Sequence, residues 1–198
     1  MGFEILGLAQ ESNGINMETY QQFHQLFENR TILLNWEVNE SLLENVILPL
    51  KDFEKDDIDE PVTLILNTPG GSVADGLVLC NIIDNYKKRL NIFVYGYSCS
   101  MGTIILCSGN KNPNVTKYCY PFSFGLFHSG ETVVGGESTS VDDIIDFNRS
   151  INNNIQSYVV ANTNITEMEY KLHHRKQWYL TAKEMKEKGL IDIIIGEE

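Results

Sequence analysis

Residues 62–72 read VTLILNTPGGS. The first five are β-branched or aliphatic, which is typical of a buried strand, and the Pro-Gly-Gly triplet then interrupts the strand pattern. Ser72, with Asp75 three residues later, forms an approximate capping box, the signature of a helix N-terminus. The stretch therefore predicts a strand, a tight glycine corner and the start of a helix, which is the first half of a βαβ unit.

Similar strand-like runs lie on both sides of this stretch. Residues 31–34, 62–66 and 92–95 recur about every 30 residues with helix-like segments between them, the spacing of βαβ units in a parallel sheet. We predict an α/β fold of repeated βαβ units in one domain spanning residues 1–198. Residues 1–28, approximately, form an N-terminal segment of that domain.

The later part of the chain predicts a long helix. From about Ser140, apolar residues recur at helical spacing across about six turns. A helix of this length with one apolar face needs a surface to cover that face. Residues 130–136 are rich in glycine and predict a loop before it. The other expected elements are strands at residues 115–120, 122–128 and 191–195, and helices at residues 40–53 and 101–108 and from Thr166 and Thr181 onward.

Composition excludes several classes of protein. The chain has 198 residues, 42% hydrophobic and 21% charged, which is the ordinary globular range. Its formal net charge is −12, and a negative field of that size repels nucleic acid. The longest basic cluster, Lys87-Lys88-Arg89, lies where we expect a helix to end, and cations are favourable there. We therefore expect no nucleic-acid partner.

Cysteine spacing and the N-terminus limit cofactors and location. The four cysteines lie too far apart for paired C-x-x-C metal ligands, so we expect free thiols and no metal or cofactor in this chain. The first residues lack the basic region and apolar run of a signal peptide, and no stretch approaches about 18 uncharged apolar residues. We expect a cytoplasmic protein without membrane contact.

Two glycine-bearing corners follow neighbouring strands, at residues 67–72 (NTPGGS) and 96–102 (GYSCSMG). Open α/β sheets bind ligands at the carboxyl ends of their strands, and glycine lets backbone N–H groups approach an anion. A phosphate is disfavoured because the chain has no G-x-x-x-x-G-K-[ST], and no G-x-G-x-x-G after its first strand. A serine at such a corner instead suits acyl transfer through a tetrahedral oxyanion.

Acyl transfer also needs a general base, and His128 is the best of the four histidines. It ends an aromatic strand-like run, whereas His24 lies in an amphipathic N-terminal helix and His173 and His174 in a polar basic segment. A histidine in this position is more often structural, so the hypothesis depends on its combination with the two corners.

The order of residues disfavours two common serine hydrolase arrangements. Residues 101–127 contain no Asp or Glu, so the α/β-hydrolase order, with its acid between serine and histidine, is not met. The pattern G-x-S-x-G fails at both registers of the second corner. Only His24 precedes the serine, which disfavours the chymotrypsin order.

At this point the sequence resembles the proteolytic subunit family of the Clp protease, within the crotonase-like fold superfamily. The resemblance covers most of the chain, from about Thr19 to Ile195. The separation of Gly71 and Ser100 also fits the family's pattern. The matching motifs are residues 26–34 (first-strand entry), residues 67–72 (N-S-P-G-G loop), Ser100-Met101-Gly102 (A-S-M-G nucleophile motif), and residues 180–182 and 189–192 (closing signature).

The resemblance implies a serine endopeptidase with Ser100 as nucleophile, His128 as general base and the N–H groups of Gly71 and Met101 as oxyanion hole. It implies a protruding helix, the handle, within about residues 129–165. Proteins of this kind form heptameric rings that stack in pairs into tetradecamers and enclose the sites that cleave peptides or unfolded proteins. An AAA+ unfoldase feeds that chamber, so ATP acts only through the partner.

The third triad position departs from the family. The closing signature aligns Gln177 with the family's aspartate, and no acid lies between Glu169 and Glu184. Loss of this acid in a serine protease costs on the order of 10⁴ in rate, although a glutamine carbonyl still accepts a hydrogen bond. Two hypotheses stay open: an active serine endopeptidase, and a catalytically impaired subunit that serves as a structural or regulatory ring partner.

Two other interpretations use the same corners. Cys99 precedes Ser100, but adjacent side chains point in different directions, and buried cysteine is usually inert. A crotonase-like enzyme would hold a thioester enolate on the paired N–H groups and use acids for proton transfer. The two corners carry no acid, so we expect neither chemistry.

Overall fold

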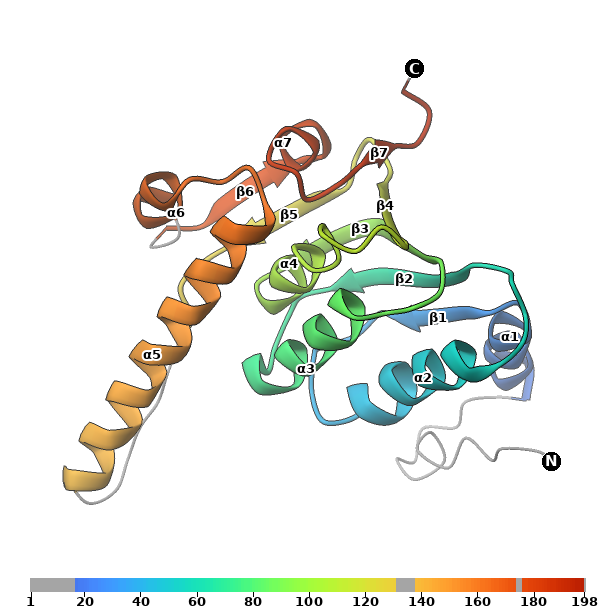
Figure 1. Ribbon diagram of the computed structural model, residues 1–198, viewed down its shortest axis with the longest axis horizontal. Coiled ribbons are helices and arrows are strands. Elements are labelled where there is room, and N and C mark those ends of the chain that lie inside the picture. Colours follow the sequence, from blue (N-terminus) through green and yellow to red (C-terminus); the bar gives the residue numbers. More distant parts are fainter. Residues whose placement is uncertain (1–16, 131–137, 174–175, 198) are drawn as a thin grey trace.

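The computed structural model describes residues 17–130, 138–173 and 176–197, and these form a mixed α/β fold (Figure 1). Its strands are β1 (Thr31–Leu34), β2 (Val62–Thr68), β3 (Leu90–Cys99), β4 (Val115–Cys119), β5 (Phe124–Phe127), β6 (Trp178–Thr181) and β7 (Ile193–Ile194). The order β1-β2-β3-β4-β7 is parallel throughout; β5 pairs in parallel with β3, and β6 pairs antiparallel with β5. The predicted α/β class is confirmed.

The helices connect the strands as the βαβ pattern predicts. The predicted helix at residues 40–53 begins as a π-helical turn, Leu43–Ile47, that runs directly into a regular helix. Pro49 lies in the first turn of that helix, where its missing N–H leaves no hydrogen bond unmade. The helices are α1 (Met17–Glu28), α2 (Leu48–Lys55), α3 (Val73–Asp84), α4 (Met101–Leu106), α5 (Ser138–Asn162), α6 (Glu167–His173) and α7 (Ala182–Glu187).

Side-chain caps start three of these helices where the sequence predicts, and at α6 the Thr166 hydroxyl accepts from the Glu169 N–H at 3.2 Å. The Ser72 hydroxyl accepts from the Asp75 N–H at the start of α3. Thr181 and Glu184 form a reciprocal capping box at the start of α7. α5 begins two residues before the expected Ser140, and most of the loop expected at residues 130–136 lies outside the described residues.

Two details of the expected organisation need correction. β6 is a strand that the sequence pattern does not predict, because a four-residue run that leads into a helix cap resembles a helix start. The basic cluster Lys87-Lys88-Arg89 lies beyond the end of α3 rather than in its last turn. Lys88 Nζ instead lies 2.7 Å from an Asp56 carboxylate oxygen, so this part of the cluster pairs with the acidic loop that precedes β2.

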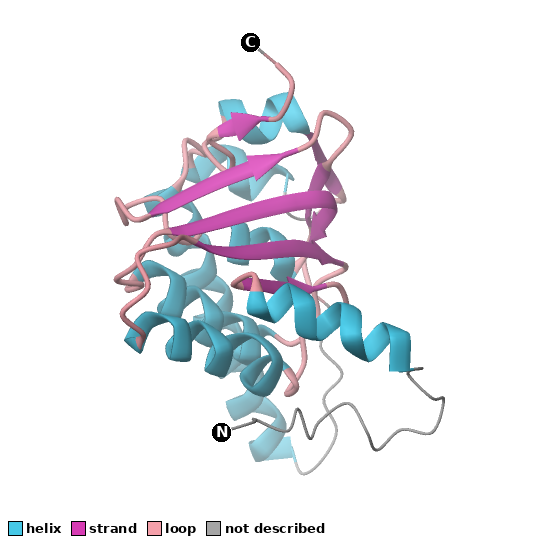
Figure 2. Cartoon of the chain, turned by 90° about the vertical axis from the view of Figure 1, so that its right-hand side faces the viewer, coloured by secondary structure: helices cyan, strands magenta, loops and turns pink. Residues whose placement is uncertain are grey.

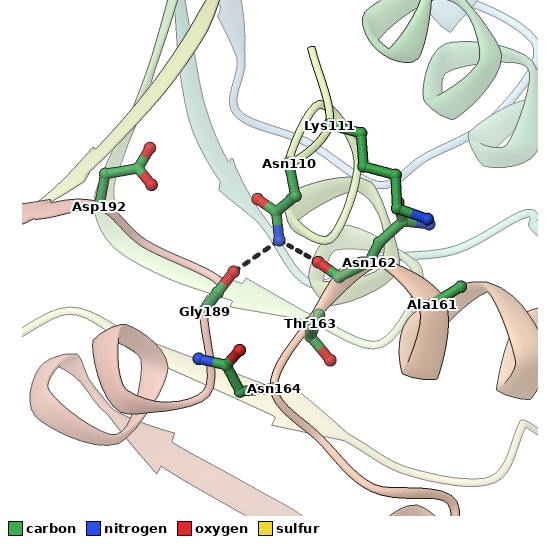
Figure 3. Close-up of a pocket in the computed structure, with 8 residues that line it drawn as sticks. All are labelled: Asn110, Lys111, Ala161, Asn162, Thr163, Asn164, Gly189 and Asp192. Carbon is green, nitrogen blue, oxygen red and sulfur yellow. Dashed lines mark hydrogen bonds between the residues drawn. The ribbon is translucent and has the colours of Figure 1, made fainter. Parts of the chain in front are cut away.

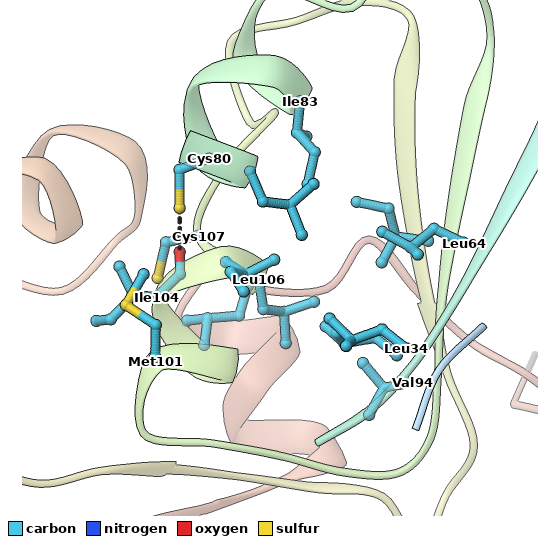
Figure 4. Packing of buried hydrophobic residues seen from close by; sticks show 14 of the residues in the cluster. Leu34, Leu64, Cys80, Ile83, Val94, Met101, Ile104, Leu106 and Cys107 are labelled. Carbon is cyan, nitrogen blue, oxygen red and sulfur yellow. Dashed lines mark hydrogen bonds between the residues drawn. The ribbon is translucent and has the colours of Figure 1, made fainter. Parts of the chain in front are cut away.

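The core lies between one face of the sheet and the connecting helices. Figure 4 shows Leu34, Leu64 and Val94 of three neighbouring strands beneath Ile83 of α3 and Leu106 of α4, and all five are 0% exposed. Burying one such side chain contributes about 1.5–3 kcal/mol. Because α3 and α4 are both packed on the sheet in this way, the corners that precede them are held in place.

The opposite face of the sheet is open in the described part of the chain, and Figure 2 looks onto it. Phe93 stacks on Tyr118 with ring centroids 4.5 Å apart, and Tyr95 meets Tyr120 edge to face at 5.5 Å. We call these four residues the aromatic face. Tyr95 is 51% exposed. Large aromatic side chains on an open face indicate a contact surface.

α5 projects away from the sheet (Figure 1). Ile155 and Val159, near its C-terminal end, are buried in the core, whereas Ile144 and Phe147 nearer its start are exposed. The helix is thus anchored at one end and presents apolar side chains at the other. No helix in the described ranges is long and apolar enough to cross a membrane.

Candidate active site

Ser100 lies at the corner between β3 and α4. Its φ of +53° is unusual for a residue with a Cβ and costs roughly 1–3 kcal/mol, so surrounding contacts must hold it. The Ser100 N–H donates to the Leu126 carbonyl at 2.8 Å. The Thr103 hydroxyl lies 2.6 Å from the Ser98 carbonyl and 2.8 Å from the Leu126 carbonyl. Through these hydrogen bonds, Ser100 and Thr103 are both held against Leu126 of β5.

His128 reaches Ser100 because β5 runs beside the end of β3. Cys99 pairs with Leu126 in the parallel register, and His128 follows two residues later. Its Nε2 lies 2.7 Å from the Ser100 Oγ, a hydrogen bond in which the roles depend on the histidine tautomer. The ring is exposed, so a substrate has access to the pair. The structure thus brings together the nucleophile and base that the sequence predicts.

The glycine corner lies directly against Ser100. Gly70 and Gly71 have φ of +94° and +143°, which side-chain-bearing residues rarely adopt. A Cβ on Gly70 would lie 2.6 Å from the Ser100 Cβ and 2.8 Å from the Met101 backbone nitrogen. Both glycines are therefore required by conformation, and Gly70 also by the close approach of the two corners.

The neighbouring strand end fixes the glycine corner and leaves its key donor free. Val38 forms a parallel bridge with Gly71, in which the Val38 N–H donates to the Gly70 carbonyl and the Ser72 N–H donates to the Val38 carbonyl, both at 2.7 Å. In the described part of the chain, the N–H groups of Gly71 and Met101 donate to no acceptor. Two free donors beside a nucleophile suit an oxyanion.

Gln177 lies opposite His128, and the described residues show no hydrogen bond between the two side chains. Phe127 pairs with Trp178 in the antiparallel register, and one further step places Gln177 across from His128. The Gln177 side chain is exposed, and its Oε1 accepts from the Tyr179 hydroxyl at 3.1 Å. Across residues 17–130, 138–173 and 176–197, the His128 ring has a single hydrogen bond, to Ser100. The backbone position of Gln177 thus suits a third triad member, but its side-chain carbonyl bonds to Tyr179 instead of His128.

Cys99 has neither the exposure nor the ionisation of a nucleophile. Its side chain is buried, and that burial raises the pKa of its thiol. Because the thiolate is the reactive form, a raised pKa disfavours attack. Cys80, Cys107 and Cys119 are likewise buried free cysteines.

One acidic residue near the site was missed. Glu37 belongs to neither corner in the sequence, yet its Cγ lies 2.8 Å from where a Cβ of Gly71 would stand. The two corners carry no acid of their own, as the sequence shows, but Glu37 lies beside Gly71 in the fold. Its place in the sequence, shortly after β1, could have indicated this position. Because β1 is parallel to β2, the carboxyl ends of both strands lie at the same edge of the sheet.

A shallow pocket in the described part of the chain lies away from these residues. Its volume is about 320 Å³, and Figure 3 shows Asn110, Asn162 and Gly189 in its wall. None of the residues that line it belongs to either corner. The described residues hold no group of three His, Cys, Asp or Glu side chains placed to bind a metal ion.

A serine hydrogen-bonded to a histidine, with two free N–H donors beside it on a parallel α/β sheet, defines a candidate serine hydrolase. The family model for Clp protease matches residues 14–198. The chain therefore belongs to the Clp protease family, a family of peptidases, and the resemblance seen in the sequence is confirmed.

Proposed function

We propose that this chain is a serine endopeptidase that cleaves peptides or unfolded proteins inside an oligomeric ring. The 2.7 Å contact between His128 Nε2 and Ser100 Oγ carries the proposal. With Nε2 unprotonated, His128 takes the hydroxyl proton as Oγ bonds to the substrate carbonyl carbon. The N–H groups of Gly71 and Met101 bind the resulting oxyanion.

The remaining steps use the same groups. The C–N bond breaks as His128 returns the proton to the leaving amine, and an acyl ester remains on Ser100. His128 then takes a proton from water, whose oxygen attacks the ester, and Ser100 recovers its proton as the acid product leaves. The family's triad aspartate, which stabilises the imidazolium, is replaced by Gln177, so we expect slower turnover than in a complete triad.

Two surfaces support assembly into a ring. The aromatic face and the exposed Ile144 and Phe147 of α5 are apolar surfaces that a monomer would leave in water. Family membership supports a heptameric ring, or a tetradecamer of two rings, with a possible AAA+ unfoldase partner. Light scattering is expected to give several times the monomer mass of 22.5 kDa. A measured mass equal to that of the monomer would contradict the proposed ring.

A serine-directed fluorophosphonate tests the site without knowledge of the substrate. Ser100 Oγ bonds to phosphorus as His128 takes the hydroxyl proton, the P–F bond breaks and fluoride leaves. Intact mass is expected to show one adduct on the wild type and none on Ser100→Ala or His128→Ala. Ser129→Ala, which removes an exposed serine next to His128, is the matched control and should label normally. Labelling of Ser100→Ala at the wild-type rate would contradict the assignment.

A second function follows from the orientation of Gln177. Because its carbonyl contacts Tyr179 rather than His128, the chain is also a candidate for an impaired subunit that serves as a structural or regulatory ring partner. Absence of any adduct in a folded oligomer, together with copurification of a second subunit that has a complete triad, would favour this role over the enzyme.

A further inference from the structure

Lys117 is a buried charge that the proposed chemistry does not use. It lies on β4 and is 1% exposed. Its Nζ donates to the Leu106 carbonyl at 2.9 Å, to the Ser108 carbonyl at 3.3 Å and to the Asn110 side-chain oxygen. These acceptors belong to the last residue of α4 and the turn that follows it. The ammonium therefore closes the C-terminal end of the helix whose other end carries Ser100 and Met101.

The same turn is bound to two other parts of the fold. The Asn110 amide donates to the Asn162 carbonyl at the end of α5 and, at 2.6 Å, to the Gly189 carbonyl after α7; Figure 3 shows both bonds. Lys117 thus holds Asn110 on one side while α5 and the Gly189 turn hold it on the other. The C-terminal end of α4 is the centre of a polar junction.

A second link reaches the same junction from α3. One Asp84 carboxylate oxygen accepts from the Gly109 N–H and the other accepts from the Tyr158 hydroxyl of α5, both at 2.7 Å. The turn at residues 108–110 is therefore fixed by groups from α3, β4 and α5. Lys117 contributes the only buried side-chain cation among the described residues that contact this turn.

We propose that Lys117 is a positioning residue for the reaction: by holding the C-terminal carbonyls of α4, its ammonium sets the position of Ser100 and the Met101 N–H at the other end. α4 has six residues, so the two ends are only about 9 Å apart. The last carbonyls of a helix have no partner within the helix and carry partial negative charge, so an ammonium with three N–H donors stabilises them. The inference rests on the proposed serine peptidase site.

Protonation of Lys117 makes this role measurable. Burial lowers the pKa of Lys117 to about 8, and nearby Cys107, Asp192 and Asp84 oppose that shift only in part. Loss of the proton removes the charge and leaves two N–H donors for three acceptors. We therefore expect the reactivity of Ser100 to fall as the pH rises through about 8.

The contribution of Lys117 to stability should move in the opposite direction. The pKa of Lys117 is 10.5 when unperturbed and lower in the fold, so between about pH 8 and 10.5 the unfolded chain binds more protons than the folded chain. The contribution of this group to the free energy of unfolding therefore increases with pH in that window. The buried thiols of Cys80, Cys99, Cys107 and Cys119, whose pKa values burial raises, act in the other direction above about pH 9, so unfolding has to be measured at each pH.

The test is the second-order rate of fluorophosphonate labelling against pH, with urea unfolding measured in parallel. For the full-length wild type we expect labelling to fall roughly tenfold between pH 7 and pH 9.5 while urea unfolding shows that the protein is still folded at each pH. In Lys117→Met, which keeps chain length but removes charge and donors, we expect labelling at pH 7 to be roughly 10- to 100-fold slower and the alkaline fall to be absent. Lys117→Arg, which stays charged, should also lose the alkaline fall.

Lys111→Met is the matched control, because this exposed lysine lies in the same loop; it should keep the wild-type rate and pH profile. An unchanged alkaline fall in Lys117→Met or Lys117→Arg would overturn the inference. Should neither variant fold, a wild-type rate that stays constant from pH 7 to 9.5 would also overturn it. No labelling of the wild type at any pH would instead contradict the proposed function itself.

Discussion

The two sides of the His128 ring differ in how firmly the fold holds them. On the Nε2 side, Ser100 is fixed by its backbone bond to Leu126 and by the Thr103 hydroxyl, and its Oγ lies 2.7 Å away. On the other side, Gln177 turns its carbonyl to Tyr179. Several hydrogen bonds therefore hold Ser100 in place on the first side, the nucleophile side, whereas the second side, the orienting side, depends on the exposed side chain of Gln177 alone. The fold therefore preserves the nucleophile even where the triad departs from the family.

The largest effect should come from the nucleophile side. Gly71→Ala places a Cβ 2.3 Å from the Val38 carbonyl at a φ that alanine rarely adopts, so the corner must shift and its N–H leaves the oxyanion position. We expect fluorophosphonate labelling to slow by about 10²–10³. Gly130→Ala, which adds a Cβ in open space, is the matched control. A wild-type rate in Gly71→Ala would mean that this N–H takes no part.

The sequence predicts that the two corners lie together at one edge of the sheet, because local signals mark both of them. Gly70, Gly71 and Ser100 lie at strand ends that alternation and turn residues predict, and parallel strands bring such ends to one edge. The contact of His128 with Ser100 requires β5 to pair with β3, and no local pattern in the sequence predicts that pairing.

Two features were missed in the sequence, the orientation of Gln177 and the burial of Lys117. Gln177 meets Tyr179 because both belong to the β6 region, a strand too short for its pattern to be recognised. Burial of Lys117 had a signal, since residues 115, 117 and 119 share one face of a strand and Cys119 is apolar. Because a lysine is rarely fully buried, residue type alone predicts an exposed Lys117 and conflicts with this strand pattern.

A smaller effect is expected from restoring charge on the orienting side. Gln177→Asp places a carboxylate across from His128, where it can stabilise the imidazolium. We expect labelling and peptide turnover to rise about 10- to 100-fold, part of the roughly 10⁴ that such an acid provides elsewhere. Gln177→Asn has the same length without charge and should show no gain. Equal rates for the two variants would place the third member elsewhere or show that none operates.

The smallest effect tests whether Gln177 is held away from His128 by its neighbour. Tyr179→Phe removes the hydroxyl that donates to the Gln177 Oε1 and leaves the half-exposed ring in place. A released glutamine can turn its carbonyl toward the free His128 nitrogen, and a single neutral hydrogen bond contributes about 0.5–1.5 kcal/mol, or a few-fold in rate. We therefore expect labelling to rise about two- to tenfold. The gain must vanish in Gln177→Ala/Tyr179→Phe, because the effect requires the amide; a gain that persists there would show that Tyr179 acts on the site by another route.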